Sequence, residues 1–237
     1  MPAPHTPWFP AKEFIGKSKA GLYGDYVTEV DAVIGKVMAA IKESGSFSNT
    51  IVIVTSDNGP YWRPAYIEKY NHRSAYIFRG MKADAWEGGH RVPFIVRWPN
   101  HTRAGSVSNL ISTLTNLMAT CADLVGGDKM AESSLDSYSL LPVLIQKTGS
   151  ALGQKPIINE SSGGLYAVCK SSWKLIEGRG SGGFSKPVTY QPKPGEVKGQ
   201  LYNIQSDPSE TNNLYLKNPK KVDSLSHLMA SIKNLKR

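Results

Sequence analysis

The chain lacks several features that would assign it to a class at once. It has only two cysteines, Cys121 and Cys169, without C-x-x-C spacing, which argues against a disulfide scaffold and against a structural zinc site. No apolar run is long enough to cross a bilayer, and residues 1–7 have neither the basic region nor the apolar stretch of a signal peptide. The composition is that of a globular protein, with 40% hydrophobic and 20% charged residues in 237.

The net charge of +9 leaves two interpretations open. The excess Lys and Arg could surround a site that attracts an anionic substrate, or they could be scattered over the surface without function. No nucleic-acid-binding signature accompanies the basic residues, so we do not expect a nucleic acid as partner.

The first part of the sequence has an α/β pattern. Apolar residues recur three and four positions apart over residues 25–43, which predicts an amphipathic helix with Asp25 as its N-cap and Gly45 after its end. A β-branched run at residues 51–55 predicts a buried strand of a parallel sheet with helices on both faces. Residues 60–86 show no period and are expected to form a long loop, of the kind that is usually functional or disordered. A second strand and two further helices are predicted at residues 94–98, 111–125 and 138–146.

The pattern changes near residue 150. Short β-prone runs separated by Gly-rich turns predict a small antiparallel sheet, with strands at residues 157–158, 166–170, 173–176 and 201–204. Residues 181–187 and 191–195 are expected to be exposed loops, and a helix over residues 219–236 closes the chain. We therefore predict an α/β region at residues 1–150 and a small α+β region at residues 151–237.

Asp57 and Asn58 follow the first predicted strand directly. A carboxylate and an amide oxygen side by side suit a hard cation such as Ca²⁺ or Mg²⁺, although the same residue types also form ordinary turns. Ca²⁺ takes about six to eight oxygen ligands, so any metal bound here needs further ligands from elsewhere.

Lys82 and His5 are the other candidates for chemistry. Lys82 stands in the long loop and could hold an anionic oxygen as a point charge, or it could be a solvated surface lysine. Glu87 and Arg91, in the segment that follows, are expected to pair and brace a turn. His5 lies between prolines and could donate a proton to a leaving group, or it could be an ordinary residue of a frayed terminus.

Five segments, in order along nearly the whole chain, together resemble the arylsulfatase branch of the sulfatase family. They are a His segment, a helix–strand–ligand segment, a lysine segment that leads into Glu-Gly-Gly-His-Arg-Val-Pro, and two small-sheet motifs, at residues 3–7, 25–59, 82–93, 172–176 and 201–210. The resemblance implies an α/β fold: part of an alkaline-phosphatase-like sandwich, with a mostly parallel sheet and flanking helices, followed by a small C-terminal antiparallel sheet and a terminal helix.

The resemblance also implies a chemistry. The family hydrolyses sulfate esters at a Ca²⁺ site, using a formylglycine made from Cys or Ser in a C/S-x-P-x-R motif. Carried over by position, Asp57 and Asn58 would be metal ligands, Lys82 a catalytic contact to the sulfate, and His5 the residue that helps the alcohol leave. Substrates would be sulfated small molecules or glycans, with specificity expected in the loops at residues 60–80 and 178–198. Family members are often periplasmic, secreted or lysosomal.

The sequence also departs from the family pattern. No C/S-x-P-x-R motif occurs in it, and residues 206–210, which begin like one, fail at the last position; the family's paired N-terminal aspartates have no counterpart. We therefore expect the chain alone to lack turnover and to need a missing N-terminal half of the same enzyme as its partner. Two alternatives stay open: a non-catalytic module that binds sulfated glycans, and a phosphatase or phosphodiesterase of the same fold, against which the lysine segment argues.

Overall fold

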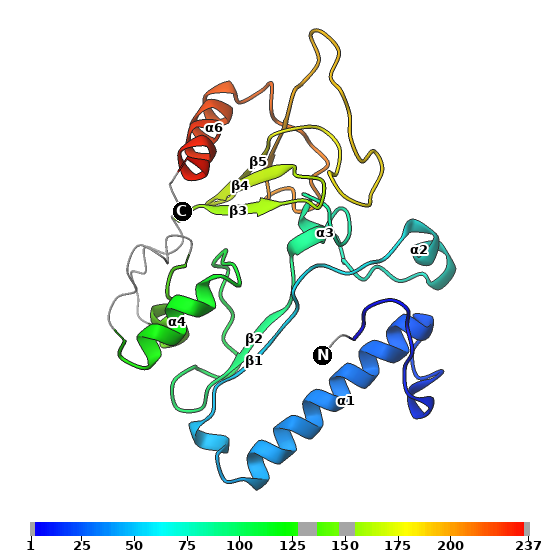
Figure 1. Ribbon diagram of the computed structural model, residues 1–237, viewed down its shortest axis with the longest axis vertical. Coiled ribbons are helices and arrows are strands. Elements are labelled where there is room, and N and C mark those ends of the chain that lie inside the picture. Colours follow the sequence, from blue (N-terminus) through cyan, green and yellow to red (C-terminus); the bar gives the residue numbers. More distant parts are fainter. Residues whose placement is uncertain (1–2, 128–136, 147–154, 235–237) are drawn as a thin grey trace.

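The computed structural model describes residues 3–127, 137–146 and 155–234. The first region contains α1 (Gly21–Glu43), β1 (Val52–Thr55), α2 (Pro64–Tyr70), α3 (Glu87–His90), β2 (Phe94–Arg97), α4 (Asn116–Leu124) and α5 (Leu141–Leu144), with short 3-10 turns at Lys12–Phe14 and Phe47–Asn49. The second contains β3 (Ile157–Glu160), β4 (Tyr166–Lys170), β5 (Trp173–Ile176), β6 (Gln200–Asn203) and α6 (Pro219–Lys233). Strands β1 and β2 lie between α1 and the second region (Figure 1).

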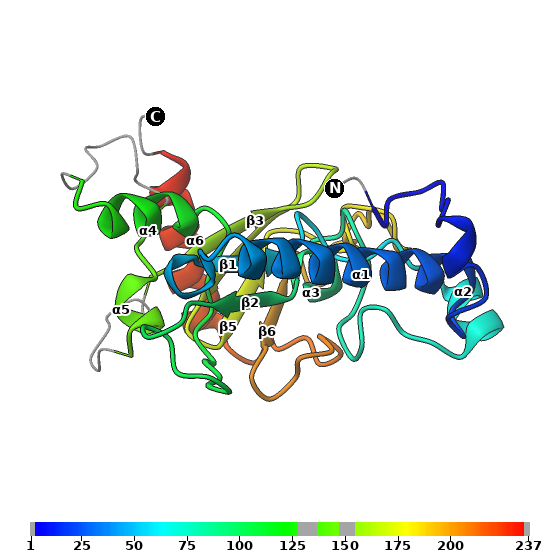
Figure 2. The same ribbon diagram turned by 90° about the horizontal axis from the view of Figure 1, so that it is seen from below.

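The long helix α1 spans the distance between α2 at one end of the molecule and α4 and α5 at the other (Figure 2). Within the described residues, no helix is both long and apolar enough to cross a membrane.

Helix α1 confirms the predicted amphipathic helix but corrects its beginning. Asp25 is not the N-cap, because the helix begins at Gly21. The Asp25 carboxylate instead accepts the backbone N–H groups of Gly16 and Ser18, at 2.9 and 2.7 Å, and so fastens the preceding segment to the helix. The predicted end is confirmed, since Gly45 has a φ of +75° directly after the last turn.

The predicted strands at residues 51–55 and 94–98 are confirmed as β1 and β2, but the pairing differs from the prediction. The two strands are antiparallel, with Ile53 opposite Val96 and Thr55 opposite Phe94, whereas β1 was expected to have parallel neighbours. A continuous β-branched run indicates burial on both faces and does not specify strand direction. Within the described residues β1 is only half-buried, and Thr55 is exposed.

The segment at residues 60–86 contains more structure than the predicted loop, because it includes helix α2. Aromatic packing holds it: buried Trp62 lies 4.7 to 6.0 Å, between ring centroids, from Trp8, Tyr23, Tyr66 and Tyr70. The indole N–H of Trp62 donates to the carbonyl of His72 at 2.8 Å. The short helices α4 and α5 begin five and three residues later than predicted.

The predicted antiparallel sheet is confirmed, with strand order β3-β4-β5-β6. One face packs against α6 through Val168, Leu175, Leu201, Val222, Leu225 and Met229. The other packs against Ala85 and Trp86 of the lysine segment through Ile157, Ala167, Cys169, Ile176, Tyr202 and Ile204. The alternation of faces along each strand explains both layers. The lysine segment is therefore part of the core of the C-terminal region.

Candidate active site

The loop after β1 presents Asp57 and Asn58 at the strand's carboxyl end. Asp57 is exposed and Asn58 is half-buried. The Ser56 hydroxyl lies 3.5 Å from Asp57 Oδ1 and 3.1 Å from the carbonyl oxygen of Asn58. The Asn58 Nδ2 group donates to the carbonyl of Gly59 at 3.0 Å, which fixes the carboxamide. No hydrogen-bond donor in the described part of the chain meets Asn58 Oδ1, so this oxygen is free to bind a cation.

Two backbone hydrogen bonds join this loop to the lysine segment. The Gly59 N–H donates to the carbonyl of Gly89 at 2.8 Å, and the Lys82 N–H donates to the carbonyl of Pro60 at 2.9 Å. Only glycine fits at position 59, because a Cβ atom there would lie 1.9 Å from the carbonyl oxygen of Gly88. The structure thus brings the Asp57–Asn58 loop and the Lys82 backbone side by side, although they are far apart in sequence.

Lys82 itself is half-buried, and its ammonium forms no salt bridge to any described residue. Two residues later, the buried Asp84 carboxylate accepts backbone hydrogen bonds from two different segments of the chain. Its Oδ2 accepts the Met81 N–H at 2.9 Å, while Oδ1 accepts the N–H groups of Phe184 and Ser185 at 2.7 and 3.0 Å. Asp84 therefore fixes the backbone on each side of Lys82 and holds the loop around residue 184 beside it.

That loop confirms a prediction only in part. Residues 181–187 were expected to be exposed, and Phe184, Lys186 and Pro187 are exposed, but Ser181 is fully buried. Its hydroxyl donates to the carbonyl of Ser185 at 2.5 Å and accepts the Gly183 N–H at 3.0 Å, while its own carbonyl accepts the Ala85 N–H at 2.8 Å. The polar composition of the loop suggested solvation, whereas its polar groups are satisfied internally and by the lysine segment.

A buried ion cluster lies behind the lysine segment. The predicted pairing of Glu87 and Arg91 is confirmed, with Arg91 Nε donating to Glu87 Oε2 at 2.8 Å. Sequence reasoning missed the rest: the fully buried Lys174 of β5 places its ammonium 2.9 Å from Glu87 Oε1 and 3.0 Å from Glu210 Oε1. Glu210 Oε2 also accepts the Glu87 N–H at 2.6 Å. A lysine within an otherwise apolar strand was the available signal.

The protonation of this cluster follows from its contacts. Burial by itself would raise the pKa of Glu87, but the Lys174 ammonium, with His90 and Arg91, holds that pKa well below its usual range. Burial and the Lys174 ammonium lower the pKa of His90. His90 Nε2 lies 3.2 Å from Lys174 Nζ and 3.3 Å from Glu87 Oε1, so the imidazole contacts both members of the ion pair. Glu87 is thus an anion held between Lys174 and Arg91, and the lowered pKa of His90 favours its neutral form.

His5 stands apart from the other predicted residues. It is exposed, and its Nδ1 lies 2.6 Å from the carbonyl oxygen of Thr6. The segment is fastened through Trp8, whose ring contacts Tyr23 and Trp62. No described contact joins His5 to Asp57, Asn58 or Lys82, so its proximity to them stays a prediction. With Nδ1 engaged, Nε2 is the ring nitrogen open to a ligand.

The donors around Asp57 fit part of a Ca²⁺ site. They are oxygens, as a hard cation prefers, and one of them has no other described partner. Within the residues that the structure describes, no group of three or more His, Cys, Asp or Glu side chains could hold a metal alone. Two side-chain ligands fall short of the six to eight that Ca²⁺ takes, so further ligands must come from outside this set.

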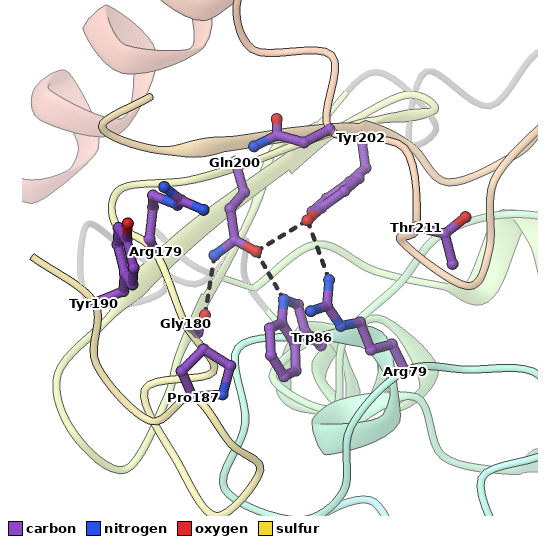
Figure 3. Close-up of a pocket in the computed structure, with 10 residues that line it drawn as sticks. Arg79, Trp86, Arg179, Gly180, Pro187, Tyr190, Gln200, Tyr202 and Thr211 are labelled. Carbon is purple, nitrogen blue, oxygen red and sulfur yellow. Dashed lines mark hydrogen bonds between the residues drawn. The ribbon is translucent and has the colours of Figure 1, made fainter. Parts of the chain in front are cut away.

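A separate cavity of about 200 Å³ lies between the lysine segment and the C-terminal sheet (Figure 3). It contains none of the four predicted site residues. The Gln200 carboxamide at its centre accepts from Trp86 Nε1 and Tyr202 Oη, both at 2.9 Å, and donates to the carbonyls of Gly178 and Gly180. Arg79 stacks 3.7 Å from the Trp86 ring centroid and donates to the Glu210 carbonyl. These polar groups bind one another, so we interpret the cavity as a feature of the packing between the two regions and not as a ligand site.

Comparison with known proteins decides the family. The family model described as Sulfatase matches residues 1–127, which is more than half of the chain. The chain belongs to the sulfatase family. This sulfatase chain is 32% identical to an N-acetylgalactosamine-6-O-sulfatase of Bacteroides thetaiotaomicron, over 97% of the chain and 45% of that protein. It is 31% identical to human arylsulfatase H, over 93% of the chain and 42% of the relative.

The fold agrees with that assignment. A solved structure from work on glycosaminoglycan metabolism by Bacteroides thetaiotaomicron superposes on the sulfatase chain with a TM-score of 0.84 and 31% identity. The match covers 98% of the chain and 49% of the solved structure, which confirms the predicted fold class. The chain spans about half the length of the relatives it matches.

Proposed function

We propose that this chain supplies one wall of a site that hydrolyses sulfate esters. In this proposal Asp57 and Asn58 hold a Ca²⁺ ion, Lys82 contacts the sulfate, and His5 assists the departing alcohol. The observation that carries the proposal is the pair of backbone hydrogen bonds between the Asp57–Asn58 loop and the lysine segment. They place cation ligands next to the backbone of a lysine whose ammonium has no described ion-pair partner.

Each residue has a distinct part in the chemistry. When bound, Ca²⁺ would neutralise charge on the sulfate oxygens. The Lys82 ammonium adds a second fixed positive charge, held by the backbone that Asp84 locks, and therefore needs little reorganisation. The imidazole of His5, through Nε2, protonates the ester oxygen as the sulfur–oxygen bond breaks. Together these groups stabilise charge on both sides of that bond.

The nucleophile is the part that these 237 residues lack, since they contain no C/S-x-P-x-R motif. We therefore propose that the isolated chain has no turnover and that an N-terminal sulfatase half supplies the nucleophile and the remaining metal ligands. The test is hydrolysis of p-nitrophenyl sulfate by the purified chain with Ca²⁺. A rate indistinguishable from buffer is expected, and a clear rate above buffer would refute the need for the second half.

Binding tests the assigned residues without turnover. Titration calorimetry with Ca²⁺ and with inorganic sulfate is expected to show weak Ca²⁺ binding, in which water takes the coordination positions that the other half would fill, and Asp57→Ala is expected to remove it. Lys82→Ala is expected to weaken sulfate binding about tenfold or more, as loss of a charge-assisted contact does. Lys36→Ala, an exposed lysine on α1, is the matched control and should change neither. Equal sulfate affinity in the Lys82 and Lys36 variants would contradict the proposal.

The names of the relatives support a proposal for the substrate class. The Bacteroides thetaiotaomicron relative is named an N-acetylgalactosamine-6-O-sulfatase, so a sulfated sugar is the substrate we propose. A binding module for sulfated glycans would behave differently: it would be retained on a sulfated polysaccharide in a salt-sensitive way even after Ca²⁺ is removed. For the proposed hydrolase site, removal of Ca²⁺ is expected to weaken retention.

A further inference from the structure

Two loops from different regions of the molecule meet beside the lysine segment. Tyr61 follows Pro60, whose carbonyl accepts the Lys82 N–H, and Phe184 belongs to the loop between β5 and β6. Their ring centroids lie 5.8 Å apart at an interplanar angle of 87°, which is an edge-to-face contact. Tyr61 stands three residues after Asn58, and the Phe184 N–H group binds Asp84, two residues after Lys82.

The backbone around Phe184 is held by two hydrogen bonds to the lysine segment. Its N–H group and that of Ser185 both bind Asp84 Oδ1. Gly183 approaches the lysine segment so closely that a Cβ atom there would lie 2.3 Å from the Ala83 carbonyl oxygen. The residue that carries the ring is therefore anchored to the two residues that follow Lys82.

The Phe184 side chain itself remains 52% exposed. Holding an apolar ring in water on a fixed backbone forgoes the free energy that its burial would provide. The Tyr61 ring is differently placed, because the Arg63 guanidinium carbon lies 5.1 Å from its centroid. Tyr61 is thus contacted by both Arg63 and Phe184, whereas Phe184 contacts only Tyr61 among the described aromatic pairs.

We propose that Phe184 is a specificity-determining residue that packs against the ring bearing the sulfate ester, and that Tyr61 is a positioning residue that orients Phe184. The ligand is a sulfate ester whose alcohol or phenol carries a ring with an apolar face, either a pyranose or an aryl ring. This inference rests on the proposed function, since it assumes that the sulfate lies against Lys82. It assigns ring recognition to a loop of the C-terminal region and sulfate recognition to the first region.

The test compares ring-bearing and ringless ligands on the same protein. N-acetylgalactosamine 6-sulfate, p-nitrophenyl sulfate, methyl sulfate and inorganic sulfate are titrated into the chain with Ca²⁺. Phe184→Ala is expected to weaken at least one ring-bearing ester about fivefold, as loss of an aromatic contact does, and to leave methyl sulfate and inorganic sulfate unchanged. Tyr61→Ala should give a smaller loss of the same kind.

Three controls separate ring contact from damage to the loop. Phe184→Trp should retain ring binding, and Phe9→Ala should change nothing, because Phe9 is a phenylalanine that is 76% exposed elsewhere. An unchanged melting temperature of Phe184→Ala shows that the fold persists. The ester that loses affinity, the sugar or the aryl one, identifies the ring.

Two results overturn the inference while leaving the proposed function intact. One is unchanged binding of both ring-bearing esters by Phe184→Ala. The other is an equal loss for methyl sulfate, which would mean that the loop shapes the anion site and does not recognise a ring. If the unmodified chain binds none of the four ligands, the proposed function fails and the inference fails with it.

Discussion

Helices α1 and α6 have similar amphipathic sequences and different surroundings. α6 has 15 residues and buries Val222, Leu225 and Met229 against the C-terminal sheet. α1 has 23 residues and buries only Gly24 and Asp25, while Val27 and Val37 are 40% and 51% exposed. Helical periodicity thus predicts a helix and its apolar face, but it does not say what covers that face.

The candidate site shows the same contrast between a well-packed part and a half-buried part. Lys82 belongs to a segment whose Ala85 and Trp86 lie in the core of the C-terminal sheet, whereas Asp57 follows β1, a half-buried strand of a two-stranded sheet. The two backbone hydrogen bonds made by Gly59 and Lys82 connect a well-packed segment to a half-buried one.

The largest expected effect is in the buried ion cluster of the well-packed region. Lys174→Met leaves Glu87 and Glu210 buried without their shared cation, which should lower the free energy of unfolding by about 3–5 kcal/mol. Urea denaturation measures this. Lys170→Met, an exposed lysine on the adjacent strand, is the control and should have little effect. Equal midpoints for the two variants would contradict the importance of the cluster.

The second prediction compares the two helices directly. Leu225→Ala in α6 should lower the free energy of unfolding by about 2–5 kcal/mol, because Leu225 is 3% exposed and its removal leaves a cavity. Val37→Ala in α1 should cost much less, since that side chain is already half in water. Thermal or urea unfolding of both variants distinguishes them. A similar cost at both positions would remove the contrast between the regions.

The third prediction concerns the connection between the regions. Gly59→Ala places a Cβ atom 1.9 Å from the Gly88 carbonyl oxygen, so the backbone must shift, at a cost of about 1–3 kcal/mol. Amide exchange at Gly59 and Lys82 should accelerate as their hydrogen bonds weaken. Gly35→Ala is the matched control: nothing lies within 4 Å of the added atom, so alanine should stabilise α1 by about 0.5–1 kcal/mol. Destabilisation by the control variant would show that other residues pack against α1 at position 35.

The smallest effect is a dependence on pH through His90. Burial and the Lys174 ammonium lower the pKa of folded His90, while the unfolded chain binds a proton near pH 6.5. The unfolded state therefore holds more protons below that pH, and stability falls as the pH decreases from about 7.5 to 5.5, by at most about 1.4 kcal/mol per unit. His90→Gln should flatten this slope, and His227→Gln, an exposed control, should preserve it. A slope that His90→Gln leaves unchanged would exclude His90 as its source.

The sequence predicted local elements well and long-range packing poorly. The four strands of the C-terminal sheet and the helix α6 follow from patterns of a few neighbouring residues. In the buried ion cluster, Glu87 is 87 positions from Lys174 and 123 positions from Glu210. No local sequence pattern indicates contacts over such separations. The burial of Ser181 is missed for the same reason, because its partner Ala85 lies in another region.

Of the candidate site, the sequence predicted the residue types and their order, but not their connection. The pairing of Glu87 with Arg91 was predictable because four residues on a helical turn place both side chains on one face. The contact between the Asp57 loop and the lysine segment depends on Gly59, whose missing side chain permits a close approach. That glycine looked like an ordinary turn residue, so the close approach could not be predicted from it.

The most direct measurement is a crystal structure of the chain grown with Ca²⁺ and sulfate. We expect a cation bound by the Asp57 carboxylate and Asn58 Oδ1 at about 2.3–2.6 Å, with a sulfate between that cation and the Lys82 ammonium. An Asp57 carboxylate directed away from Lys82, with no cavity shared between them, would contradict it.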